Sequence, residues 1–179
     1  MLRVVLILSL VSVLPACKRS KINEAKYEAA GAEAVLPFKK SLKQALVKGL
    51  EEGPVEAISA CRDDAPKLAA ASSTGGIKVG RASRKLRNPD NAPKLWMEPF
   101  LQVYESDPES REPGVVLIDE KTVGYVEPIF VQPLCVTCHG AELAPDLEAT
   151  LKELYPDDQA TGYAPGDFRG VFWAELPRQ

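Results

Sequence analysis

Apolar residues in the first third of the chain recur at helical spacing. Between residues 24 and 50 they are separated by steps of three and four, a period that predicts an amphipathic helix. The series consists of Ala25, Ala29, Ala32, Leu36, Leu42, Leu46 and Leu50. Pro37 lies inside this stretch and should kink or split the helix, because proline lacks a backbone N–H and clashes with the preceding turn.

A second helix is predicted from about residue 54 to residue 71. Gly53-Pro54 marks a stop and a new start, since proline is well tolerated in a first helical turn, and Gly75-Gly76 marks the end. One face of this helix is apolar and carries Val55, Ile58, Cys61, Ala65 and Leu68. Cys61 should therefore point inward.

Strand patterns come later in the chain. Residues 77–83, 115–118, 122–131 and 169–176 read as strands, and Asp119-Glu120-Lys121 joins the middle two as a hairpin. Residues 93–104 and 143–154 read as helices, and Asn88-Pro89 lies in a loop. Because helices come first and strands cluster late, we expect an α+β domain with N-terminal helices and a small antiparallel sheet.

The chain length fits one domain. With 179 residues it is too short for two domains of ordinary size, and its 45% hydrophobic content is that of a globular protein. The net charge of −3 gives no reason to expect nucleic acid as a partner.

The N-terminus has the pattern of an export signal. Arg3 precedes an apolar run over residues 4–14, which is too short for the roughly 20 residues that span a bilayer. Leu14-Pro15-Ala16-Cys17 resembles a bacterial lipobox, in which the cysteine is acylated, although Pro15 departs from the usual residue. An ordinary signal peptide cut near Cys17 is the alternative. We expect a signal peptide at 1–16, a tether at 17–23 and a domain at 24–179, exported to the periplasmic side and anchored to the membrane through Cys17.

Cys135-Val136-Thr137-Cys138-His139 carries the clearest chemistry. This Cys-x-x-Cys-His pattern is the attachment motif of c-type haem. Its two thiols add to the two vinyl groups of one porphyrin, and the adjacent histidine binds the iron. A dithiol redox pair, a Cys135–Cys138 disulfide, and a zinc site that adds Cys61 are the alternatives. We expect one covalent haem c.

The second iron ligand is constrained because His139 is the only histidine in the chain. Cys61, Met97, a lysine, a tyrosine or no residue would fill the sixth position. Cysteine counting favours Cys61: with Cys17 assigned to lipid and two cysteines to haem, it is left over in an oxidising compartment. The alternatives are that Cys61 is a small buried hydrophobe and that Met97 is a core residue.

Four sequence blocks together resemble a known family. They are Ala60 to Pro66, Val79 to Ser83 with Arg87 to Pro93, Pro133 to Gly140, and Tyr155 to Tyr163 with Gly166 to Gly170. The chain thus resembles single-haem c-type domains with a PAS-like fold, a family first catalogued as a domain of unknown function. Its members are free exported proteins and sensor regions of histidine kinases. The resemblance implies that His139 and Cys61 are the axial pair. Trp96-Met97-Glu98 departs from the family pattern, which has an acidic residue directly after the tryptophan.

A basic run is the remaining candidate feature, and Arg81 is our choice within it for binding a haem propionate. Guanidinium groups pair well with carboxylates, and Arg81 lies in one of the matching blocks. A solvated loop face is the alternative for the rest of the run. The run contains Lys78, Arg81, Arg84, Lys85 and Arg87.

Two functions follow from these expectations. The first is a redox or small-gas sensor module that signals through a protein partner, in which a labile Cys61 ligand frees a site for a gas. The second is a periplasmic electron-transfer cytochrome. An enzyme is not expected, since the only histidine is already assigned to iron and no distal acid–base group is evident.

Overall fold

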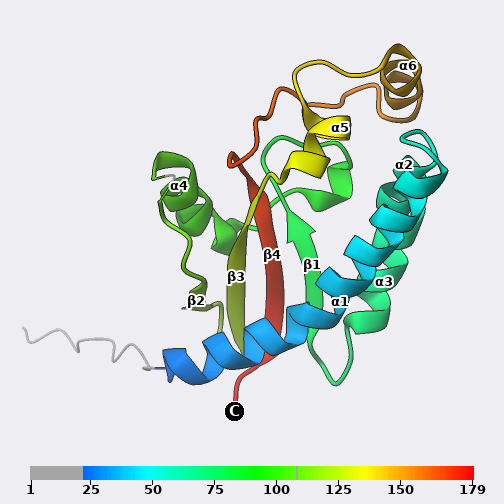
Figure 1. Cartoon of the computed structure of the whole chain (residues 1–179). Helices are drawn as coiled ribbons and strands as arrows, with labels where there is room; N and C mark the ends of the chain where they lie inside the picture. The colour runs from blue at the N-terminus through cyan, green and yellow to red at the C-terminus, as the bar shows by residue number, and fades with distance from the viewer. Residues whose placement is uncertain (1–21, 108) are drawn as a thin grey trace, which may run out of the picture.

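The computed structural model describes residues 22–107 and 109–179, which form a four-stranded antiparallel sheet with helices on both faces (Figure 1). The proposed signal peptide, Cys17 and most of the predicted tether lie outside the described residues. Among the residues that are described, no helix has the length and apolarity needed to cross a bilayer.

The α+β prediction is confirmed, and the sheet order is β1-β4-β3-β2. The last strand of the chain therefore lies between β1 and β3, with antiparallel pairing to both. The helices are α1 (Glu24–Glu52), α2 (Ala57–Ser59), α3 (Ala65–Ser72), α4 (Glu98–Ser106), α5 (Val136–His139) and α6 (Pro145–Leu154). The strands are β1 (Lys78–Ala82), β2 (Gly114–Leu117), β3 (Thr122–Phe130) and β4 (Phe168–Pro177).

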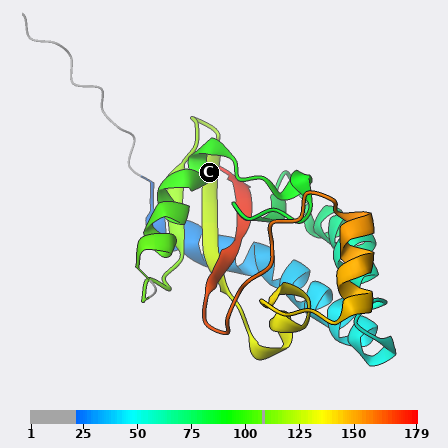
Figure 2. The same ribbon diagram turned by 90° about the horizontal axis from the view of Figure 1, so that it is seen from above.

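Helix α1 crosses one face of the sheet (Figure 2). It begins at Asn23, whose Oδ1 accepts a hydrogen bond from the backbone N–H of Lys26 at 3.1 Å. The predicted split at Pro37 is wrong, because α1 is assigned as one helix through that residue. Val35 and Phe38, on either side of Pro37, are both buried against the sheet, and this packing outweighs the lost backbone hydrogen bond.

The apolar series predicted for α1 is only partly the buried one. Its first members, from Ala25 to Leu36, are exposed, whereas Tyr27, Val35, Phe38 and Leu42 form the buried face. Alanines support helix formation through propensity but bury little apolar area. The larger side chains therefore decide which face of the helix meets the sheet.

Side chains of the central strand β4 alternate between two cores. Phe172, Ala174 and Leu176 pack with α1, whereas Val171 and Trp173 pack with the α4 side. This alternation is the period of two expected for a strand that is covered on both faces. The sheet is thus a rigid layer from which the loops at one end project.

The predicted second helix is present with an irregularity at its centre. Between α2 and α3 the backbone forms a π-helical turn over Ala60–Asp64, so the helical segment continues to Ser72 with one turn widened. Cys61 lies in this turn. Single π-helical turns are rare and occur frequently at functional sites.

Candidate haem-binding site

A cavity of about 580 Å³ opens at one end of the sheet, and every site residue predicted from the sequence lines it: Cys61, Arg81, Cys135, Cys138 and His139. Its volume lies in the range of about 300–1,000 Å³ that is usual for small-molecule and cofactor sites. The apolar part of the wall comes mainly from α1, α2 and the end of β3, and includes Leu42, Leu46, Leu50, Ile58 and Phe130.

The Cys-x-x-Cys-His segment forms two short turns beside this cavity. Pro133 starts a 3₁₀ turn that ends at Cys135, and α5 follows directly from Val136 to His139. The backbone N–H of Gln132 donates to Sγ of Cys135 at 3.4 Å, and burial raises the pKa of the Cys138 thiol. Cys61, Cys135 and Cys138 are all free thiols, so the structure does not contain the alternative disulfide.

His139 is held as a neutral imidazole with a defined tautomer. Its Nδ1 lies 2.6 Å from the backbone carbonyl oxygen of Ala160, and because a carbonyl only accepts, Nδ1 carries the proton. The opposite nitrogen, Nε2, therefore keeps its lone pair. Burial, followed by the charge of Arg87, lowers the pKa of His139 to about 3, and the Tyr163 ring meets the imidazole edge-on at 6.3 Å. An imidazole with one bonded N–H and one free nitrogen is arranged as a metal ligand.

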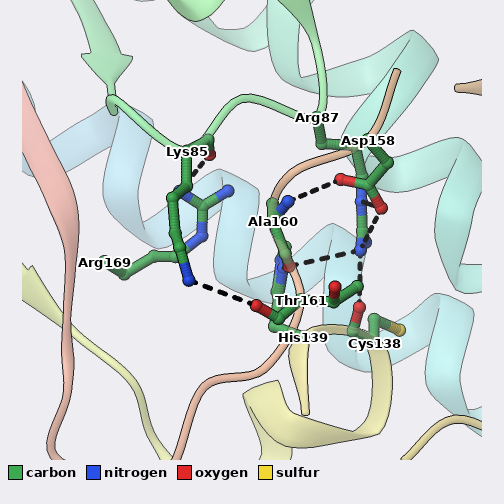
Figure 3. A network of polar contacts seen from close by, with 8 residues as sticks. All are labelled: Lys85, Arg87, Cys138, His139, Asp158, Ala160, Thr161 and Arg169. Atoms are coloured by element: carbon green, nitrogen blue, oxygen red, sulfur yellow. Dashed lines mark hydrogen bonds and ion pairs between the residues drawn. The ribbon is translucent and has the colours of Figure 1, made fainter. Parts of the chain in front are cut away.

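The polar network in Figure 3 lies on the Nδ1 side of the His139 imidazole. Nη2 of Arg87 donates to the Cys138 carbonyl oxygen at 2.6 Å, and its Nε donates to Asp158 Oδ2 at 3.0 Å. Both side chains of this ion pair are 10% exposed. The network therefore connects the Cys-x-x-Cys-His segment to the loop that carries Ala160.

The wall of the cavity is strongly cationic. Among the described residues that line it none is acidic, whereas six are basic: Lys39, Lys43, Arg81, Lys85, Arg87 and Arg169. Two of these, Lys39 and Arg87, form ion pairs with Glu127 and Asp158. The remaining positive charge suits a ligand that carries carboxylates.

Arg169 was not predicted from the sequence, although it lies in one of the matching blocks. Its Nη1 donates to Ser83 Oγ at 2.5 Å and to the Lys85 carbonyl oxygen at 3.2 Å, and burial lowers its pKa. Arg81 donates from Nη2 to the Cys61 carbonyl oxygen at 3.2 Å. Two guanidinium groups that form no ion pair with a carboxylate of the described residues thus approach the cavity, one beside the Cys61 turn and one from β4.

Neither the zinc arrangement nor ligation by Met97 is found in the structure. Within the described part of the chain, no three His, Cys, Asp or Glu side chains are placed to hold a metal ion together, so the four-residue zinc arrangement is not present there. Met97 is completely buried in the core on the α4 side and does not line the cavity, as expected for a core methionine.

The donors and the shape of this cavity fit a haem. The Cys61 thiol and a neutral imidazole nitrogen line it together with the thiols of Cys135 and Cys138, and its wall is partly apolar. Guanidinium groups that form no ion pair within the described part of the chain are available for carboxylates. A Cys-x-x-Cys-His segment at such a cavity in an α+β domain defines a haem-binding protein.

The chain belongs to the Tll0287-like family, whose profile matches residues 20–177. Among solved structures, the chain is similar to the crystal structure of the cyanobacterial haem-protein Tll0287. The sequences are 25% identical, the TM-score is 0.63, and the match covers 81% of this chain and 93% of the other. No curated protein sequence matches the chain.

Proposed function

We propose that this protein carries one haem, bound covalently through thioether bonds to Cys135 and Cys138 with His139 and Cys61 as iron ligands. We further propose that it acts as an exported redox or small-gas sensor module that signals through a protein partner. The observation that carries the proposal is the shared cavity, in which a free thiol from a π-helical turn and the only imidazole of the chain are lining residues.

The two proposed ligands differ in how firmly they are held. His139 is fixed by the Ala160 carbonyl and by the edge of the Tyr163 ring. Cys61 lies in a widened turn, where its backbone carbonyl accepts a hydrogen bond from Arg81. A thiolate stabilises ferric iron, so the potential should be low. Loss of the Cys61 bond on reduction would free a site for a small gas.

Arg81 and Arg169 are proposed to bind the two haem propionates. A guanidinium has five N–H donors in a planar fork that matches a carboxylate. Arg81 donates to the protein through Nη2 and Arg169 through Nη1, so other N–H donors of each guanidinium can meet a carboxylate. Because neither has an acidic partner among the described residues, two carboxylates would neutralise charges that are otherwise unpaired at the cavity.

Electron transfer is the second candidate function, and a basic surface on α1 favours it. Lys40, Lys43 and Lys48 are exposed together with Val47 along a groove on this helix that also contains one acidic residue, Glu51. Lys43 also lines the proposed haem cavity. Positive charge around an exposed apolar residue near a redox group suits docking of an acidic electron-transfer partner. A carrier of this kind should keep both iron ligands in both oxidation states.

The first experiment is the visible spectrum of protein produced with a cytochrome c assembly system. It is recorded in the ferric state, in the ferrous state, and in the ferrous state with carbon monoxide. Thioether-haem bands with a thiolate-type ferric spectrum, followed by carbon monoxide binding on reduction, are expected for the sensor. A six-coordinate ferrous haem that does not bind the gas would instead favour the carrier. Absence of covalent haem would refute the proposal.

Export and anchoring are proposed from the N-terminal segment. Fractionation of the producing cells should place the wild-type chain in the membrane fraction and Cys17→Ala in the soluble periplasmic fraction. Equal release of both proteins would show that an ordinary signal peptide, without acylation of Cys17, accounts for export.

A further inference from the structure

Arg87 contacts the haem-attachment turn and the loop behind His139 at the same time. Its Nη2 donates to the Cys138 carbonyl oxygen at 2.6 Å and lies 3.5 Å from the Ala160 carbonyl oxygen, the same atom that accepts the Nδ1–H of His139. Arg87 and His139 therefore share one acceptor (Figure 3).

Asp158 contacts both Arg87 and the backbone of Ala160. Its Oδ2 accepts from Nε of Arg87 at 3.0 Å, and its Oδ1 accepts from the backbone N–H of Ala160 at 2.8 Å. The backbone N–H of Gln159, between the two, donates to the Leu86 carbonyl oxygen at 2.7 Å. The position of the Ala160 carbonyl is thus determined by a buried ion pair and by the backbone next to Arg87.

We propose that Arg87 and Asp158 are positioning residues that set the hydrogen bond from His139 to Ala160 and thereby tune the reduction potential of the haem. The inference rests on the proposed function, in which His139 binds the iron. The partner of the non-coordinating N–H of a histidine ligand sets its orientation and basicity, and such partners change metal affinity or activity substantially when they are removed.

The electrostatic part of the proposal gives opposite signs for the two residues. Reduction of the iron adds one electron, so nearby positive charge raises the potential and nearby negative charge lowers it. In the wild-type protein the two charges largely compensate each other. Asp158→Asn leaves the positive charge of Arg87 uncompensated and should raise the reduction potential. Arg87→Gln leaves the negative charge of Asp158 uncompensated and should lower it.

The competition for the Ala160 carbonyl reinforces the effect of changing Arg87. When Arg87 no longer approaches this oxygen, the Nδ1–H of His139 has the acceptor to itself. A stronger hydrogen bond makes the imidazole a better donor and stabilises ferric iron. Both effects of Arg87→Gln lower the potential.

The test is a redox titration of the haem-loaded protein, followed in the visible spectrum. Asp158→Asn should raise the midpoint and Arg87→Gln should lower it, each by an amount that changes the ferric-to-ferrous ratio about tenfold, which is about 59 mV for one electron. Arg87→Lys keeps the charge and should restore most of the potential. The matched control is Arg84→Gln, an arginine that is paired with Glu98 and does not line the cavity.

If Arg87 and Asp158 acted only by holding the backbone in place, every substitution would loosen His139 and all midpoint potentials would shift in the same direction. That result, or shifts no larger than the control's, would overturn the inference. Asp158→Asn and Arg87→Lys are conservative changes that keep the test usable if Arg87→Gln folds poorly. The titration requires covalent haem in the wild-type protein. Absence of this haem would count against the proposed function, and it would be seen in the wild-type spectrum before any variant is compared.

Discussion

Gly31 allows α1 to lie close against the sheet, and replacing it with alanine should destabilise the protein. A Cβ added at this position would lie 2.6 Å from Cβ of Tyr125 and even closer to its ring. Tyr125 is 1% exposed and belongs to the core cluster between α1 and the sheet. Either the ring or the helix must therefore shift.

The expected magnitude follows from two opposing effects. Overpacking of a well-filled core costs about 1–3 kcal/mol, whereas alanine in place of glycine in a helix interior stabilises by up to about 1 kcal/mol. The net loss should be about 1–2 kcal/mol. In a domain of this size that corresponds to a fall in Tm of about 2–8 °C.

The assay is thermal unfolding of Gly31→Ala followed by circular dichroism, with Ala32→Leu as the control. Ala32 is the next residue along α1 and is exposed, so added bulk there should change stability by no more than about 0.5 kcal/mol. The sign decides the test: an unchanged or raised Tm for Gly31→Ala would show that helix propensity dominates and that the close packing on Tyr125 is not limiting.

Three further predictions concern the site and the core. Cys61→Ala should keep covalent haem but lose the thiolate-type ferric spectrum, and an unchanged ferric spectrum would refute the role of Cys61 as a ligand. Cys135→Ala should instead show one thioether bond fewer by mass spectrometry and altered pyridine haemochrome bands. Arg87→Met should cost about 3–5 kcal/mol in urea unfolding because it leaves a buried carboxylate unpaired, against less than about 1 kcal/mol for Arg84→Met at an exposed pair. Burial raises the pKa of Tyr104 to about 12. The neutral Tyr104 side chain should therefore contribute fully to the free energy of unfolding below pH 10, and this contribution should be lost as the pH rises from about 10 to 12. The decrease in the free energy of unfolding over this pH range, measured by urea unfolding, should be smaller for Tyr104→Phe.

The sheet and the attachment segment could be predicted from the sequence because their signals are local. Alternation and turn residues located all four described strands to within two residues. The spacing of Cys135, Cys138 and His139 indicated a haem protein, in agreement with the family of the chain, while covalent attachment through the two cysteines stays a prediction. Cys61 was identified through counting and through resemblance, and the structure places it at the same cavity. That it binds iron stays a prediction.

The features that the sequence did not reveal depend on contacts between distant segments. The partnership of Arg87 with Asp158 joins residues 71 positions apart, and no local pattern distinguishes Arg87 from the other cations of the basic run. The buried face of α1 was misjudged because evenly spaced alanines resemble an apolar stripe, while Tyr27 and Phe38 contribute more buried area. The π-helical turn at Cys61 has no composition signal of its own.

The position of β4 in the sheet has a consequence for the order of assembly. β4 follows β1, β2 and β3 in the chain, yet it is the neighbour of both β1 and β3, and it contributes Arg169, Gly170 and Phe172 to the cavity wall. A chain emerging from its N-terminus therefore presents Cys135 and Cys138 before the sheet has its central member. If haem is attached to these cysteines as proposed, we expect their thiols to be most accessible in this interval, and β4 to complete the cavity wall after the attachment. A chain that ends before Phe168 should consequently neither fold nor retain a protected haem.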